Sequence, residues 1–190
     1  MTDRNERLRA DFYDMLSLQD RPYLSWTATK GDPPCAEEYL LDIRLRSYAL
    51  SADHGRYTVG VIRGCTVKVT LWDSYPATPP YVKMLTIPPV FHPCWYSKGV
   101  YCPPRKWRAD RSLKDYILEM LRTLRYDPEL IESEAPANYK ALEWYTRHKG
   151  DTTLFPSDRT ELSENSPQEA AVYEKAALSF DEIVDSWGVR

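Results

Sequence analysis

Two short stretches decide how this chain is interpreted: residues 75–80 read YPATPP, and residues 92–102 read HPCWYSKGVYC. The second stretch belongs to a proline-rich segment, residues 88–111, for which we expect little regular secondary structure, because proline fixes φ and lacks a backbone donor. An irregular segment of this length inside a compact domain is often functional. Its side chains are therefore the first candidates for a site.

The sequence before residue 75 alternates in the manner of a small sheet that follows one helix. Residues 4–19 carry apolar side chains at helical spacing, with Arg4, Arg7, Asp11 and Asp14 mostly on other faces. Runs rich in aromatic and β-branched residues predict strands, with a loop around residues 51–55. These runs are residues 23–29, 39–45, 57–62, 65–72 and 81–87. Four or five strands joined by short turns predict an antiparallel meander.

Helices follow the irregular segment. Ser112 is placed to cap a helix over residues 113–126, with Asp115 three positions on as in a capping box. A second helix is predicted over residues 138–148, and its expected buried side chains are Tyr139, Leu142 and either Trp144 or Tyr145. The order of helix, meander, irregular segment and helices predicts an α+β fold.

The chain divides by composition into a catalytic-type domain and an appendage. We expect residues 1–150 to form the domain and the polar residues 151–166 to form a linker. Pro167 then begins an amphipathic helix over residues 167–190. Its apolar face packs either on the domain or on a partner.

Bulk properties exclude several classes of function. The net charge of -3, with no long run of one sign, gives no support for nucleic-acid or membrane-surface binding. No apolar stretch has the length of a membrane span, and the polar N-terminus is not a secretory signal, so a cytoplasmic protein is expected. The cysteines form no metal-binding spacing with the histidines, so we expect no metal and reduced thiols. They are Cys35, Cys65, Cys94 and Cys102.

The motifs resemble those of the ubiquitin-conjugating enzyme family. That family has Y-P-x-x-P-P after its third strand, then His-Pro-Asn, a glycine seven positions after the histidine and the catalytic cysteine ten positions after it. Gly99 and Cys102 stand at those spacings from His92. Further matches are Trp107, the capped helix at Ser112-Leu113, and Pro136, Asn138, Ala141 and Tyr145 of the pattern P-x-N-x-x-A-x-x-x-Y. The resemblance covers residues 4–150 and implies the ubiquitin-conjugating fold.

The resemblance implies that Cys102 carries a ubiquitin-like protein as a thioester and transfers it to an amine on a target protein. Sulfur suits this role because a thiolate is both a good nucleophile and a good leaving group. An activating enzyme would use the ATP, so this chain needs no cofactor. The family's loop-structuring positions correspond to His92, Pro93, Gly99 and Trp107.

The first helix contacts the activating enzyme in the family. Here it carries Arg4, Arg7 and Arg9, which either make that contact or form a solvated basic face.

The chain departs from the family at the position of the loop asparagine, which is Cys94 here. A thiol is a much poorer donor than the amide that is thought to brace the loop and stabilise the oxyanion. Tyr96 is the substitute we favour, and the alternative is a surface aromatic. Glu132 or Glu134 is expected either to orient or deprotonate the acceptor amine, or to be solvated surface.

Two more departures concern partners. Ala77 stands where many members have an aromatic that contacts RING-type ligases, and Pro103-Pro104 follows Cys102 directly. Both fit a divergent member of the kind found in bacterial operons for ubiquitin-like conjugation, some of them antiphage systems.

Two rival hypotheses remain at this point. The chain could be a catalytically inactive module of the same fold that scaffolds a conjugation complex, because the loop asparagine is missing. It could also be a cysteine protease, with Cys94-Trp95 and His148 as the reactive pair, although the flanking motifs of such enzymes are absent.

Overall fold

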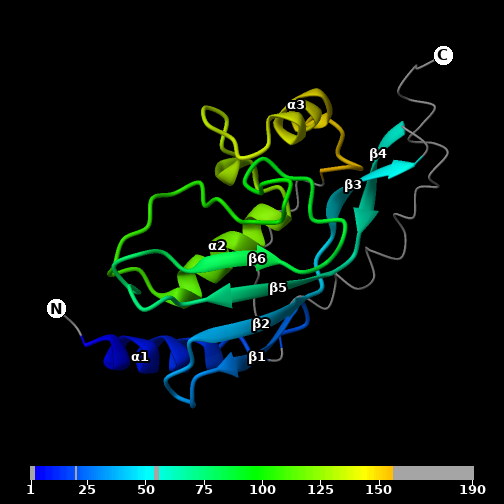
Figure 1. Cartoon of the computed structure of the whole chain (residues 1–190). Helices are drawn as coiled ribbons and strands as arrows, with labels where there is room; N and C mark the ends of the chain where they lie inside the picture. The colour runs from blue at the N-terminus through cyan, green and yellow to red at the C-terminus, as the bar shows by residue number, and fades with distance from the viewer. Residues whose placement is uncertain (1–2, 20, 54–55, 156–190) are drawn as a thin grey trace. The chain divides into compact units, whose positions relative to one another are not determined.

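The computed structural model describes residues 3–19, 21–53 and 56–155, and its centre is a four-stranded antiparallel sheet (Figure 1). The strands lie in the order β1-β2-β5-β6. Their bounds are Leu24–Lys30 for β1, Glu38–Ile43 for β2, Cys65–Thr70 for β5 and Tyr81–Met84 for β6. The inward side chains Leu41, Val67 and Val82 are buried, so one face of the sheet forms the core.

A hairpin leaves this sheet between β2 and β5. Strands β3 (Ser47–Asp53) and β4 (Arg56–Ile62) form a second, two-stranded sheet, and Ala49 of β3 also bridges to Val90. The prediction of one continuous meander was therefore wrong for residues 57–62, and residues 51–53, which were expected in a loop, belong to strand β3. Ile43 at the end of β2 pairs with Cys65 at the start of β5, so the four-stranded sheet is continuous at the base of the hairpin.

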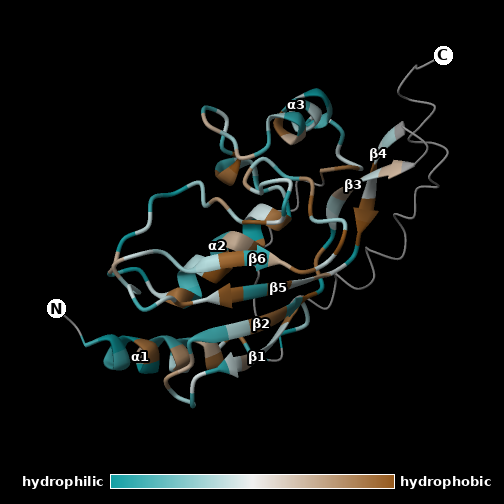
Figure 2. Ribbon diagram, viewed as in Figure 1, coloured by the Kyte–Doolittle hydropathy of each residue, from teal (hydrophilic) through white to brown (hydrophobic). Residues whose placement is uncertain are grey.

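Helix α2 (Leu113–Leu124) supplies most of the helical core. In Figure 2 its apolar residues lie behind β5 and β6, where brown and teal residues alternate along the strands. The expected apolar stripe is confirmed, because its members are all at most 1% exposed: Leu113, Ile117, Met120, Leu121 and Leu124. The Ser112 hydroxyl accepts the N–H of Asp115 at 3.1 Å, as the capping pattern predicted.

The other two α-helices differ in detail from their predictions. Helix α1 (Arg4–Leu16) ends earlier than expected, and Asp11, which was predicted on a polar face, is 1% exposed. Helix α3 (Tyr139–His148) buries Trp144 and Tyr145, but Tyr139 is 70% exposed, so its predicted burial was wrong. A 3₁₀ turn, η1 (Pro128–Leu130), precedes α3.

The chain divides into two compact units, residues 1–147 and 148–190. Of the second, residues 148–155 are described, and they form a turn in which the Asp151 carboxylate accepts from the backbone and hydroxyl of Thr153. The predicted linker lies mostly outside the described residues, and the helix predicted over 167–190 lies wholly outside them. Within the described ranges no helix has the length and apolar character of a membrane span.

Candidate active site

The motif residues 92–102 form a short antiparallel ribbon that carries Cys102 at its end. Trp95 bridges to Tyr101, and the N–H of Tyr96 donates to the carbonyl of Val100 at 2.9 Å. The turn between the two arms uses Gly99, whose φ of +80° favours glycine. A Cβ at this position would lie 3.2 Å from the carbonyl oxygen of Met84, so the turn is also tightly packed.

The second arm of the ribbon is attached to the central sheet. The N–H of Met84 donates to the carbonyl of Gly99 at 2.7 Å, and the N–H of Tyr101 donates to Val82 at 3.0 Å. The segment predicted to be irregular thus extends the edge at β6 by backbone bonds. Cys102 is held by a strand-like frame rather than by a free loop.

The two faces of the ribbon differ because side chains alternate along each arm. Trp95 and Tyr101 point to the buried face, where their ring centroids are 5.1 Å apart and Tyr101 meets Tyr116 of α2. Cys94 and Cys102 occupy the other face, which also carries Tyr96. The structure therefore brings three of the predicted site residues together on one face.

Cys102 is half-buried, and the Tyr96 side chain lies against it. The negative charge of Cys102, together with a hydrogen bond between the two side chains, raises the pKa of the Tyr96 hydroxyl. Tyr96 is itself 48% exposed, so an incoming group can reach the space between them. The thiol and the hydroxyl are therefore both partly exposed to solvent.

Cys94 lies opposite Cys102 but in a different environment. It is 1% exposed, and its thiol donates to the carbonyl of Leu130 at 3.2 Å. Burial raises the pKa of this thiol to about 11, although a hydrogen bond from the backbone of Glu132 acts in the opposite direction. Cys94 is therefore a neutral brace between the ribbon and residues 130–132, and it lacks the thiolate character that a cysteine protease needs.

His92 is a structural residue of the same loop. Its Nδ1 accepts the N–H of Cys94 at 2.9 Å, and its ring lies 4.4 Å from the ring of Tyr126. Complete burial lowers the pKa of His92 to about 3, so the ring is neutral at physiological pH and its proton sits on Nε2. The neighbouring Pro93 carbonyl accepts the N–H of Asn138 at 3.2 Å, which joins the loop to the start of α3.

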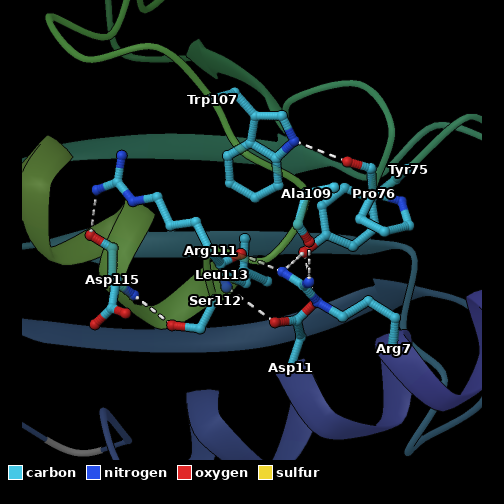
Figure 3. A network of polar contacts seen from close by, with 10 residues as sticks. All are labelled: Arg7, Asp11, Tyr75, Pro76, Trp107, Ala109, Arg111, Ser112, Leu113 and Asp115. Carbon is cyan, nitrogen blue, oxygen red and sulfur yellow. Dashed lines mark hydrogen bonds and ion pairs between the residues drawn. The ribbon is translucent and has the colours of Figure 1, made fainter. Parts of the chain in front are cut away.

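The segment after Cys102 is anchored by a buried ionic network (Figure 3). Arg7 of α1 pairs with Asp11 at 2.7 Å, donates to the Tyr75 hydroxyl at 3.0 Å, and donates to the carbonyls of Ala109 and Arg111. Burial opposes the charge of Arg7, but its bond to Asp11 and the charges around it raise the pKa of the guanidinium. Arg7 is thus committed to the interior rather than to solvent.

Asp11 completes this network at the start of α2. Its Oδ1 accepts the N–H of Leu113 at 2.9 Å, while its Oδ2 accepts from Arg7 and from the Tyr75 hydroxyl. A carboxylate at this position satisfies an orphan N–H of the helix and complements its dipole. One side chain therefore joins α1, the loop after β5 and the N-terminus of α2.

Trp107 and Glu119 hold the rest of the segment. The Trp107 ring packs against Tyr75 and Tyr116, and its indole N–H donates to the carbonyl of Pro76 at 2.8 Å. Glu119, which is 4% exposed on α2, pairs with Arg111 at 3.2 Å and with Arg105 at 3.6 Å.

The remaining predicted site residues are Glu132, Glu134, Arg4 and Arg9, which lie outside the ribbon and the ionic network. Glu132 accepts the N–H groups of Glu134 and Ala135 with its own carboxylate, and Glu134 is exposed. Arg4 pairs with Glu37 at 2.9 Å and donates to the carbonyl of Leu71, whereas Arg9 is exposed.

A hollow of about 430 Å³ adjoins the turn of the ribbon at Ser97. Its lining comes from Leu50 of β3, residues 89–91, Ser97 and residues 137–140. Among the described residues, no three or more His, Cys, Asp or Glu side chains are grouped so that they could hold a metal ion.

Comparison with known proteins shows the fold. Ubc12 of Saccharomyces cerevisiae superposes with a TM-score of 0.53 and 18% identity, over 75% of this chain and 71% of that one. A Plasmodium yoelii protein assigned to the ubiquitin-conjugating enzymes superposes with a TM-score of 0.51 and 16% identity, over 79% and 88% of the two chains. No protein-family model and no curated protein sequence matches the chain. The chain therefore has the fold of ubiquitin-conjugating enzymes.

Sequence reasoning missed the buried carboxylates Asp11 and Glu119 and the half-buried Arg111. Asp11 stands three residues after Leu8 and four before Met15, both buried, and four residues after Arg7. That spacing places it on the apolar stripe and within reach of an arginine, so the pattern contained the information. Nothing comparable marks Glu119, because its partners lie in the irregular segment.

Proposed function

We propose that this protein carries a ubiquitin-like protein as a thioester on Cys102 and transfers it to an amine of a target protein. The observation that carries the proposal is the half-buried Cys102 thiol beside the Tyr96 hydroxyl, on a rigid ribbon of a ubiquitin-conjugating fold. Burial distinguishes Cys102 from two of the other cysteines. Cys65 and Cys94 are buried, and burial raises the pKa of Cys65 to about 12.

The backbone around Cys102 favours Tyr96 as the donor for the transfer step. The N–H of Cys102 is already donated to the carbonyl of Cys94 at 2.8 Å. The next two residues, Pro103 and Pro104, have no N–H. A tetrahedral oxyanion at the thioester carbon therefore needs a side-chain donor, and the Tyr96 hydroxyl lies against the sulfur.

The other functional residues follow from their placement. We assign Cys94, His92, Pro93, Gly99 and Trp107 to the frame that positions Cys102. The acceptor protein would approach over the hollow lined by Ser97, with Glu134 exposed a few residues before the part of the lining at 137–140. An activating enzyme that spends ATP would load Cys102, and exposed Arg9 is the first-helix arginine we assign to that contact.

Charging tests this proposal with ubiquitin, its activating enzyme and ATP as the probe. Wild type should form an adduct that a thiol reductant releases, Cys102→Ser an adduct that resists reductant, and Cys102→Ala none. Cys94→Ala should still charge. An adduct that persists in Cys102→Ala would refute the assignment.

A second measurement tests Cys102 without any modifier. Limited alkylation with iodoacetamide, followed by peptide mapping, should label Cys102 well before Cys65 and Cys94, because the last two are buried. If Cys94 is labelled first, the proposed role of Cys102 fails.

The alternative function is a catalytically inactive scaffold of the same fold, and the observation that favours it is Cys94 in place of the family's asparagine. The two functions separate in the charging experiment. A scaffold would bind the modifier or the activating enzyme equally well as wild type and as Cys102→Ala, and would form no adduct.

We propose that the protein is cytoplasmic and is encoded in a compact bacterial operon. Ala77 and Pro103-Pro104 differ from the residues at these positions in family members that work with RING-type ligases. Neighbouring genes for a ubiquitin-like protein and an activating enzyme would support this setting. A gene context without either would contradict it.

A further inference from the structure

Cys94 and Cys102 stand directly opposite each other on the two arms of the active-site ribbon. The bridge between Trp95 and Tyr101 fixes the register, and one step further along the ribbon the N–H of Cys102 donates to the carbonyl of Cys94 at 2.8 Å. This is a single backbone bond, because the Cys94 N–H donates instead to His92 Nδ1. Residues opposite each other on antiparallel strands have Cα atoms about 4.5–5.5 Å apart and share one face. A disulfide requires a Cα separation of about 4.4–6.8 Å.

We propose that Cys94 is the resolving cysteine for Cys102, so that oxidation by a peroxide converts this opposed pair into a reversible disulfide. The inference does not rest on the proposed function, because it needs only the two thiols and their register. Both cysteines are free in the structure, so the pair is in its reduced state.

The different burial of the two thiols sets the order of the steps. Cys102 is half-buried and is met first by a peroxide, whereas Cys94 is 1% exposed. Burial also raises the pKa of Cys94 to about 11, so it remains a protonated thiol while Cys102 reacts. The accessible sulfur is therefore oxidised and the buried sulfur resolves it.

The chemistry balances in two steps. The Cys102 thiolate attacks one peroxide oxygen, forming an S–O bond and breaking the O–O bond, and the departing hydroxide is protonated to water. The Cys94 sulfur then attacks the sulfenic sulfur, forming the S–S bond and breaking the S–O bond. The leaving hydroxide takes the Cys94 proton and departs as a second water. The two sulfurs lose two electrons and the peroxide gains them.

The disulfide would have a structural consequence in the neighbouring segment. Cys94 must give up its hydrogen bond to the carbonyl of Leu130, so oxidation releases the contact that joins the ribbon to residues 130–132. The disulfide also engages the Cys102 sulfur, which is then no longer a free thiol. Oxidation would thus remove the accessible thiol reversibly and spare it from over-oxidation.

Peptide mapping of the full chain tests the proposal, because Lys98 lies between the two cysteines. After treatment with hydrogen peroxide, capping of free thiols and trypsin digestion, the peptides 84–98 and 99–105 should be joined, and dithiothreitol should separate them. The intact mass should fall by about 2 Da, the two hydrogens lost. In Cys94→Ser, Cys102 should instead proceed to sulfinic acid, at a level at least about tenfold above wild type.

The matched control is Cys35→Ser, which should behave as wild type because Cys35 lies outside the ribbon. The wild-type map decides the question even if Cys94→Ser does not fold. Sulfinic acid at Cys102 without the joined peptides, or a bond from Cys102 to any cysteine other than Cys94, would overturn the proposal. None of these results depends on charging with a modifier.

Discussion

The segments before and after Cys102 are held by opposite kinds of interaction. Residues 88–102 are fixed by backbone hydrogen bonds, stacked rings, a neutral thiol and a neutral histidine. Residues 103–113 are fixed by charge, through Arg7, Asp11 and Glu119. The difference shows how one half-buried cysteine can be held from two sides. Few charges lie in the segment before Cys102, while buried ions anchor the segment after it.

The comparison predicts that the charged side is the more fragile of the two. Buried ion pairs contribute little net stability when intact, but removal of one partner leaves an uncompensated buried charge. The neutral side loses only packing or one hydrogen bond at a time. The following changes test this contrast, from the largest expected loss of stability to the smallest.

Asp11→Ala should produce the largest loss, about 3–5 kcal/mol of unfolding free energy, because it strands the Arg7 guanidinium and removes the cap of Leu113. Chemical denaturation measures it. Asp14→Ala is the matched control on the exposed side of the same helix, with an expected change within about 0.5 kcal/mol. Equal losses in the two variants would contradict the charged anchor.

Acidification should lower the unfolding free energy of the domain through His92, which lies in the neutral segment 88–102. Its folded-state pKa, about 3, lies below the ordinary value of 6.5, so protons bind the unfolded state preferentially below that value. The stability is fully present above pH 6.5 and should fall by about 2 kcal/mol between pH 7 and pH 5.

The variant His92→Gln isolates this contribution. Denaturation at pH 7 and pH 5 should show that the fall in unfolding free energy is removed in His92→Gln and retained in His148→Gln. An unchanged pH dependence in His92→Gln would show that another group is responsible.

Gly99→Ala should cost about 1–2 kcal/mol, because a side chain at a positive φ is strained and the new Cβ would crowd the Met84 carbonyl. Thermal unfolding at neutral pH checks this. Gly150→Ala is the control, since a Cβ there meets nothing within 4 Å, and it should change stability by less than about 0.5 kcal/mol. A ribbon that tolerates alanine at residue 99 would not be the rigid frame described above.

Tyr96→Phe should leave stability within about 0.5 kcal/mol, because the ring stays and the hydroxyl is exposed. The rate at which a charged Cys102 discharges to free lysine should nevertheless fall by about 100-fold, as loss of an oxyanion donor does. Tyr13→Phe, at a 58% exposed tyrosine of α1, should discharge at the wild-type rate. A wild-type rate in Tyr96→Phe would exclude the hydroxyl from the transfer step.

Local patterns predicted much of this fold. The cap at Ser112 and the apolar stripe of α2 were predicted because helix propensity, capping and periodicity act within a few residues. The fold class followed from the order of elements. The β3 strand was missed because SYALSAD contains few strongly β-forming residues, and its pairing with the hairpin partner β4 decides its conformation.

The arrangement around Cys102 was predictable where spacing within one segment sufficed. The ten-residue spacing from His92 led to Cys102, and alternation along the ribbon explains why Tyr96 lies beside it. The pairing of Arg7 with the carbonyls of Ala109 and Arg111 was not predictable, because it joins residues about a hundred positions apart. The same holds for the bond from Cys94 to Leu130.

The hairpin β3–β4 has a consequence for the order in which the domain assembles. Because Ile43 pairs with Cys65, pairing of β2 with β5 must close a loop of roughly twenty residues, at an entropic cost on the order of 3 kcal/mol. A hairpin that forms early within that loop shortens the effective distance. In the folded hairpin, the carbonyl of Tyr48 accepts a hydrogen bond from the N–H of Phe91. Replacement of residues 44–64 by a two-residue turn should therefore let the sheet close faster, while Val90 and Phe91 lose the neighbour that positions the segment leading to His92.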